Sequence, residues 1–80
     1  MNYYTAYDNE ELTAPVFEHA ANIEHLEEEF MNMPEEYQQE NEDILDELER
    51  FSVLLEAFKP ETVLTVGYND NINTFTWELV

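Results

Sequence analysis

The segment at residues 61–79, ETVLTVGYNDNINTFTWEL, decides the fold, because apolar and polar residues alternate on both sides of an Asn-Asp-Asn sequence. Runs of Val, Thr and aromatic residues with a period of two are typical of strands, and Asn and Asp are typical turn residues. The pattern predicts a β-hairpin with strands at 61–68 and 73–79 and a loop of about four residues. We expect one face of the hairpin to carry the side chains of Leu64, Val66, Phe75, Trp77 and Leu79.

A single hairpin is marginally stable, so other elements must cover its apolar face. Residues 2–7 are aromatic and rich in Thr, and they predict a third strand. A helix over about residues 14–31 is predicted next, with Thr13 as N-cap and Pro15 in the first turn. Its apolar residues recur every three or four positions: Val16, Ala20, Ile23, Leu26, Phe30 and Met33.

A second helix is expected after Pro34, because proline disfavours continuation of the first helix through Met33. Its apolar positions indicate a helix over about residues 34–58, ended by Lys59 and Pro60. The polar segment 38–43 leaves two alternatives open, one continuous helix or a break near Asn41. The continuous helix is favoured, because neither Gly nor Pro lies in that segment.

The resulting order is β-α-α-β-β, which predicts an α+β fold in which two helices cover a short antiparallel sheet. Eighty residues make a single small domain, residues 1–80. The core is expected to include Phe17, Phe30, Phe51, Phe58, Phe75 and Trp77. The tyrosines are open to two interpretations, interface residues or ordinary strand residues: Tyr3, Tyr4, Tyr7 and Tyr37.

The charge is the second decisive feature, with 20 acidic residues against two basic ones and a formal net charge of −18. Charge of one sign destabilises a compact state through self-repulsion, and like-charged pairs four residues apart destabilise helices. We therefore expect the acids to serve a strongly basic partner protein. Anionic lipid would be repelled, and direct nucleic-acid binding would need clusters of Lys and Arg.

The candidate partner-binding residues lie on the two helices. On a continuous second helix, four acids form a row that spans roughly 16 Å: Glu36, Glu40, Asp43 and Glu47. Their acidic neighbours are Glu35, Glu42 and Asp46, and the first helix supplies a second group, Glu24, Glu27 and Glu28.

Catalytic and metal-binding chemistry has little support in the sequence. His19 and His25 are six residues apart, so they do not share a helix face, and both are expected at the surface or its boundary. The chain has no cysteine and a single glycine, which excludes a thiol nucleophile and a glycine-rich phosphate loop. We expect no enzyme activity, no cofactor and no metal. The absence of a signal-like segment and of a long apolar run predicts a cytoplasmic location away from membranes.

In charge and size the chain resembles the small acidic DNA-mimic proteins that phages and mobile elements encode against restriction enzymes, CRISPR effectors and DNA glycosylases. The stretches Tyr-Asp-Asn-Glu-Glu at 7–11 and Pro-Glu-Glu at 34–36 look like stretches common in such inhibitors. The resemblance implies an anti-restriction or anti-CRISPR type of inhibitor that occupies the basic groove of a nucleic-acid-binding protein in a bacterial host.

Two alternatives remain. The first is an acidic adaptor or antitoxin-like partner of a basic protein that does not compete with DNA. The second is a coiled-coil-like homodimer whose acids confer solubility, with its seam between Ile44 and Phe58. A homodimer is favoured over a monomer, because two copies would lengthen the acidic surface.

Overall fold

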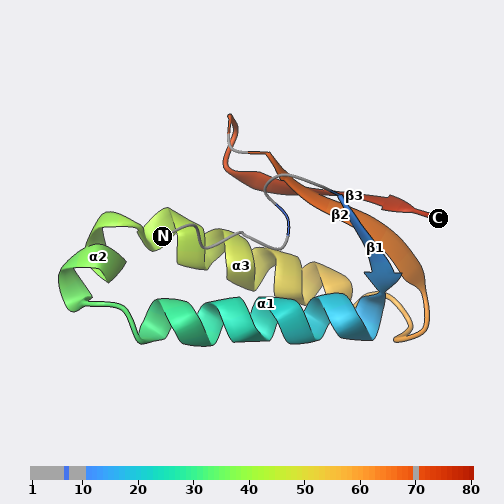
Figure 1. Ribbon diagram of the computed structural model, residues 1–80, viewed down its shortest axis with the longest axis horizontal. Coiled ribbons are helices and arrows are strands. Elements are labelled where there is room, and N and C mark those ends of the chain that lie inside the picture. Colours follow the sequence, from blue (N-terminus) through green and yellow to red (C-terminus); the bar gives the residue numbers. More distant parts are fainter. Residues whose placement is uncertain (1–6, 8–10, 70) are drawn as a thin grey trace.

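The computed structural model describes residue 7 and residues 11–69 and 71–80. It confirms the α+β class and the predicted order of strands and helices, with the second expected helix divided in two (Figure 1). The elements are β1 (Leu12–Pro15), α1 (Val16–Met31), α2 (Glu35–Glu40), α3 (Glu42–Leu55), β2 (Val63–Asn69) and β3 (Thr74–Leu79). Within the described residues, no helix is both long enough and apolar enough to cross a membrane.

The predicted hairpin is present as β2 and β3, and β2 is the central strand of an antiparallel sheet with the order β1-β2-β3. Val66 pairs with Trp77 and Tyr68 with Phe75, so the expected apolar residues do share a face. In the connecting loop, the amide of Asn71 donates a hydrogen bond to the Asn69 side chain at 2.9 Å. The turn chemistry expected from the asparagines is thus observed.

The third strand of the described sheet is β1, which was not predicted as a strand. Of the strand expected at residues 2–7, only Tyr7 lies within the described residues; it occupies a turn, and its carbonyl accepts a hydrogen bond from the Tyr68 amide at 3.4 Å. Thr13 is not a helix cap, because it lies in β1 with its hydroxyl 2.9 Å from that of Thr65. Pro15 takes the N-cap position instead.

The start of α1 needs no side-chain cap, because the chain before β2 supplies backbone acceptors. The Val16 amide donates to the Thr62 carbonyl at 2.7 Å, and the Phe17 amide donates to the Pro60 carbonyl at 3.0 Å. These bonds satisfy two of the amides that every helix N-terminus leaves without an internal partner. A contact between distant segments thus replaces the local cap that the sequence predicted.

The prediction of one continuous helix over 34–58 is wrong, because the helix breaks at Asn41. Asn41 has φ −125° and ψ 34°, and its side-chain amide donates to the Tyr37 carbonyl at 2.9 Å. An asparagine side chain competes in this way with the helical hydrogen bonds of the backbone, without help from Gly or Pro. The helix α3 also ends earlier than expected, at Leu55, and turns at residues 56–58 follow it.

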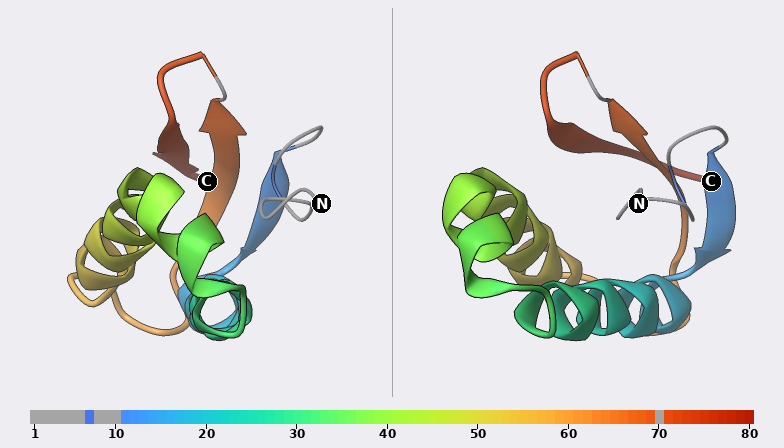
Figure 2. Two further views of the ribbon diagram at one scale, coloured as in Figure 1. Left: turned by 90° about the vertical axis from the view of Figure 1, so that its left-hand side faces the viewer. Right: turned by 60° about the vertical axis from the view of Figure 1, so that its left-hand side comes forward.

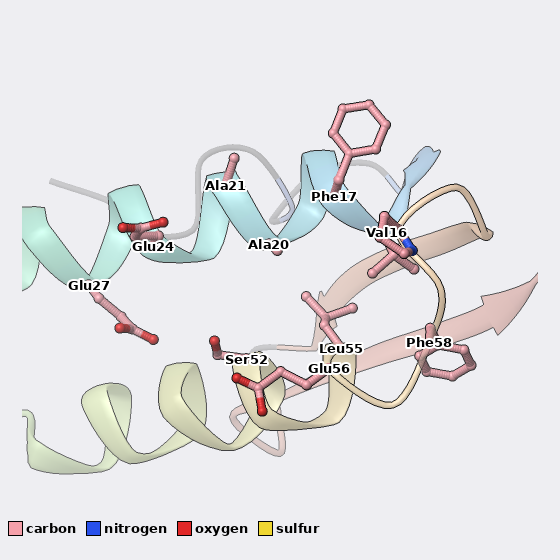
Figure 3. A pocket seen from close by; sticks show the side chains of 11 residues that line it. Val16, Phe17, Ala20, Ala21, Glu24, Glu27, Ser52, Leu55, Glu56 and Phe58 are labelled. Atoms are coloured by element: carbon pink, nitrogen blue, oxygen red, sulfur yellow. The ribbon is translucent and has the colours of Figure 1, made fainter.

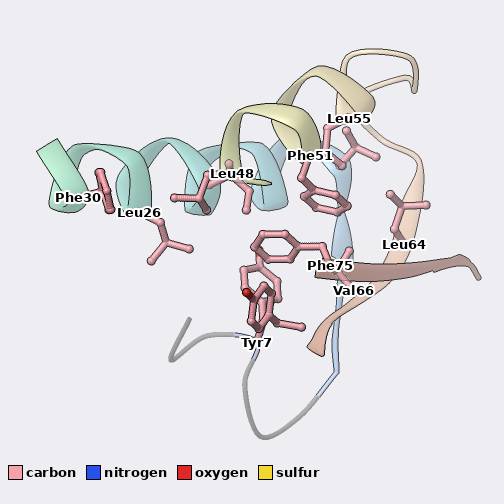
Figure 4. Close-up of a cluster of buried hydrophobic side chains, with 12 residues drawn as sticks. Tyr7, Leu26, Phe30, Leu48, Phe51, Leu55, Leu64, Val66 and Phe75 are labelled. Atoms are coloured by element: carbon pink, nitrogen blue, oxygen red, sulfur yellow. The ribbon is translucent and has the colours of Figure 1, made fainter. Parts of the chain in front are cut away.

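The helices α1 and α3 run antiparallel beside one another, and the sheet covers one side of the pair (Figures 1 and 2). The core fills the space between these two layers (Figure 4). Its centre is aromatic, since the Phe51 and Phe75 rings stack at 4.7 Å and Tyr7 meets Phe75 edge-on at 5.5 Å. The buried hydrophobic residues of this cluster are Tyr7, Val16, Ile23, Leu26, Phe30, Leu48, Phe51, Leu55, Leu64, Val66, Tyr68 and Phe75.

Three of the six expected core aromatics are buried, namely Phe30, Phe51 and Phe75. Phe58 and Trp77 are partly exposed and pack edge-on against one another at 5.2 Å. The sixth, Phe17, was predicted wrongly, because 60% of its surface is exposed. The end of β3 extends past the helix pair (Figure 1). Exposure along its apolar face therefore rises toward the C-terminus, from the buried Phe75 to Trp77 and Leu79.

Candidate partner-binding surface

Carboxylates from two helices gather where α1 and α3 lie side by side. Glu24 and Glu27 are three residues apart on α1, so they are neighbours on its surface. Glu49 of α3 is close enough to Glu27 to act on its charge. Glu56, two turns further along α3, lines a groove between the helices together with Glu24 and Glu27. We call these four residues, Glu24, Glu27, Glu49 and Glu56, the acidic seam.

The charges of the acidic seam repel one another. The pKa of Glu27 is raised first by its partial burial, then by the nearby carboxylate of Glu49 and then by that of Glu24. Two ion pairs join described residues, Arg50 with Glu47 and His25 with Glu29, and neither includes an acid of the seam. The seam is thus a concentration of like charge that these ion pairs do not offset.

Beside the acidic seam, α1 and α3 enclose an open groove of about 810 Å³. Figure 3 shows Glu27 of α1 and Ser52 of α3 pointing toward one another across it, with Leu55 reaching up from α3. Val16 and Ala20 contribute apolar surface from α1, and Phe58 stands at one end. The groove therefore combines an apolar floor with carboxylates at its rim.

The predicted row of acids on the second helix is divided by the break at Asn41. Glu36 and Glu40 are exposed on α2, and Asp43 is exposed at the start of α3. The fourth member, Glu47, is buried and turns toward the sheet. These four residues therefore do not form one continuous lattice of exposed charge.

Glu47 joins α3 to β3. One of its carboxylate oxygens accepts hydrogen bonds from the Thr74 hydroxyl at 2.7 Å and from the Phe75 amide at 3.3 Å. The other oxygen lies 3.5 Å from the Arg50 guanidinium. This carboxylate is engaged inside the protein, and its partners could not be read from helical spacing because two of them lie on a distant strand.

The remaining predicted acids are accessible. Glu27 is half-buried, and Glu24 and Glu28 lie beside it around a shallow hollow formed by the end of α1. The others are exposed, on α2 or in the first half of α3: Glu35, Glu42 and Asp46. Glu49 and Glu56 were not among the predicted partner-binding residues. Their signal was a seven-residue recurrence, Glu42, Glu49 and Glu56, which places acids on one face of α3.

His19 was expected near the surface, and this prediction is wrong, because the residue is fully buried. Its Nε2 lies 3.0 Å from the Leu64 carbonyl, which can only accept, so the proton is on Nε2. Nδ1 then accepts a hydrogen bond from the Tyr7 hydroxyl at 3.3 Å. The histidine thus links α1 to the central strand, whereas His25 is exposed as predicted.

Burial also changes the acidity of Tyr7. It raises the pKa of the phenol, the charge of Glu18 acts in the same direction, and a hydrogen bond from the Asn22 side chain acts against both. The neutral Tyr7 hydroxyl therefore remains the donor to His19, which gives the ring a structural role. Among the described residues, no group of three or more His, Asp or Glu side chains could hold a metal ion.

Comparison of the chain with models of protein families, with curated proteins and with solved structures found no match.

Proposed function

We propose that this protein is a non-enzymatic inhibitor that occupies the basic nucleic-acid-binding groove of a DNA-binding or defence protein, such as a restriction enzyme or a CRISPR effector. The observation that carries the proposal is the acidic seam, where two helices bring carboxylates together and where neither ion pair of the described residues includes a seam acid. Such a cluster lowers the stability of the free protein, since like charges repel. A basic partner would relieve that repulsion.

The placement of the acids on two helices supports mimicry of phosphates. The helices α1 and α3 pack against one another, and Glu49 of α3 lies close enough to Glu27 of α1 for the two charges to interact. Negative charge is thus spread over two neighbouring helices, on a surface wider than one helix. In a partner with Lys and Arg on both sides of a duplex-binding groove, the side chains of one side could contact carboxylates of α1 and those of the other side carboxylates of α3.

The mechanism needs no chemical step. A net charge of −18 attracts a basic surface over long range and accelerates encounter at low salt. After docking, the carboxylates of the acidic seam and the exposed acids of α2 would accept hydrogen bonds from Lys and Arg side chains. DNA would then be excluded, because both ligands require the same cations.

Competition with DNA tests this proposal. A panel of a restriction endonuclease, a CRISPR effector, a DNA glycosylase and a nucleoid protein would each be bound to a fluorescent duplex, and release of the duplex would be followed by anisotropy. We expect release from at least one of them, weakened by added salt. Charge reversal in the seam, E49K with E56K, should abolish release.

The matched control is E61K with E78K, which changes the net charge equally at exposed acids outside α1 and α3. This control should inhibit as the wild type does. If both double variants lose inhibition to the same extent, net charge alone acts and the proposed surface is wrong. If the protein binds a basic partner and DNA does not compete, the adaptor function is correct instead.

The coiled-coil dimer receives no support from the packing of α3. Three residues of the expected dimer seam, Leu48, Phe51 and Leu55, are buried in the core between the helices and the sheet. Their apolar surface is therefore already covered within one chain. Sedimentation at several protein concentrations checks whether a dimer forms through another surface.

A further inference from the structure

The groove between α1 and α3 has a composition that binding to cations alone does not explain. Its accessible apolar lining includes Ala20, Ala21 and Phe58, whereas Val16 and Leu55 beneath them are buried in the core. Glu24, Glu27 and Glu56 supply negative charge along part of its edge (Figure 3). Phe17, which lines it as well, exposes 60% of its surface. A groove with apolar side chains at one end and acids along part of its edge matches a ligand that presents both apolar and basic side chains.

We infer that this groove binds a basic amphipathic helix of the target protein, with an apolar side chain of that helix on the groove floor and its Lys and Arg side chains at the acidic rim. The inference rests on the proposed function for the basic character of the partner, and it adds a specific contact. Helix-in-groove binding uses apolar anchors spaced along one helix face.

The dimensions of the groove suit one helix. Along α1 its lining extends from Val16 to Glu27, and at 1.5 Å per residue this is about 16 Å, or about three turns of a docked helix. Lys and Arg on that helix would reach both rims, because α1 contributes Glu24 and Glu27 and α3 contributes Glu56. The long aliphatic stems of Lys and Arg would also cover part of the apolar floor.

The apolar contact would supply a selectivity that charge does not. A purely acidic surface attracts nucleic-acid-binding proteins in general, since these contact phosphates through Lys and Arg. A partner that also inserts an apolar side chain gains affinity from burial of that side chain, which lowers its rate of dissociation. The groove would therefore distinguish one target among many basic proteins.

The test uses two synthetic peptides of Leu and Lys, each of about 18 residues, which is long enough to form a helix. In one peptide the leucines lie on one helix face, and in the other the same residues are scrambled. Binding to the intact protein is measured by anisotropy at physiological salt. We expect the amphipathic peptide to bind about tenfold more tightly than the scrambled one.

Two variants change the groove without changing its charge. F17Q removes an exposed apolar side chain from the edge, and S52W fills the space between the helices; each should weaken the amphipathic peptide by about tenfold. The matched control is V53Q, because Val53 is 65% exposed on α3 and does not line the groove. V53Q should bind as the wild type does, and circular dichroism shows whether each variant is folded.

Equal binding of the two peptides, or wild-type affinity in both F17Q and S52W, would overturn the inference. The DNA-displacement assay separates it from the proposed function. If F17Q releases DNA as well as the wild type does, the inhibitor function holds and the groove has no part in it. If the amphipathic peptide binds in the groove and no DNA is displaced, the groove contact holds and the inhibitor function fails.

Discussion

The two sides of the helix pair differ in how their polar side chains are paired. On the sheet side, Glu47 and His19 are buried, and each makes hydrogen bonds to groups on a distant strand. On the opposite side, partial burial raises the pKa of Glu27, and the nearby charges of Glu49 and Glu24 raise it further. The buried polar groups hold the fold together, whereas the acidic seam works against it.

This difference separates residues that serve the fold from residues available for a partner. A buried polar group with its hydrogen bonds satisfied is costly to remove, because its partners would stay buried and unpaired. A carboxylate among other carboxylates costs the folded state free energy, so its removal should be neutral or favourable. The predictions below test that contrast by substitution on each side.

The largest effect is expected at His19. H19A would leave the Leu64 carbonyl and the Tyr7 hydroxyl without this partner and would create a cavity in the core, lowering the free energy of unfolding by about 2–4 kcal/mol. Urea unfolding measures the change. H25A is the control, because His25 is exposed and its loss should change stability by less than about 0.5 kcal/mol. Equal effects of the two substitutions would contradict the structural role of His19.

Glu47 and Glu49 allow a second comparison within α3. The two residues are two positions apart, but Glu47 is buried on the sheet side, whereas Glu49 is exposed in the acidic seam. E47A should destabilise the protein by about 1–3 kcal/mol, because the Phe75 amide and the Thr74 hydroxyl lose their acceptor. E49A should leave stability unchanged or raise it slightly, since it removes a charge from the acidic seam. Thermal unfolding at neutral pH measures the change in stability for each variant. If E47A stabilised the protein, the contrast between a buried, hydrogen-bonded acid and an acid of the seam would be wrong.

Salt should stabilise the folded protein by screening the repulsion among its acids. Between about 10 mM and 1 M NaCl the screening length falls from about 30 to 3 Å. We expect the Tm to rise by about 4–8 °C, which is equivalent to about 1 kcal/mol for a domain of this size. The double variant E49K with E56K should respond less, as it replaces two of the repelling charges. A Tm that does not depend on salt would show that the carboxylates are well dispersed.

The smallest change in stability is expected on substitution of Glu27, and the raised pKa of this residue determines the direction of that change. A folded state that binds this proton more tightly loses stability as pH rises through the folded-state pKa. E27Q should therefore stabilise the protein at pH 7 by about 0.2–0.5 kcal/mol, the size of one like-charge pair on a helix. The gain should vanish below the ordinary carboxyl pKa of about 4.3, where wild-type Glu27 is protonated in both states. A gain of equal size at pH 3 would show that the removed charge is not its cause.

Local patterns predicted α1 and the β2–β3 hairpin correctly. The hairpin follows from alternating residues on both sides of an asparagine-rich turn, and the end of α1 follows from Pro34. In each case the deciding interactions join residues that are close in sequence. The break at Asn41 is local too, but its cause is a side-chain hydrogen bond to the Tyr37 carbonyl rather than Gly or Pro, which are the stronger signals.

The sequence predicted which type of residue forms the candidate site, but it predicted the arrangement of those residues only in part. The helices were correctly expected to carry the acids, and Glu24 and Glu27 lie in the acidic seam. Glu47 satisfies the same helical spacing as Glu36, Glu40 and Asp43, yet it turns to the sheet. Spacing along one helix shows which residues share a face, but it does not show which other element packs against that face.

The amino-acid sequence by itself determined the order of strands and helices, the turn between the last two strands and the excess of negative charge, because these depend on residue type and short-range spacing. Only the tertiary structure decided that α1 and α3 would bring Glu27 and Glu49 together, and that Glu47 and His19 would find partners on distant strands. The physical reason is that the environment of a side chain is set by whichever segments pack against it, and those segments are far away along the chain.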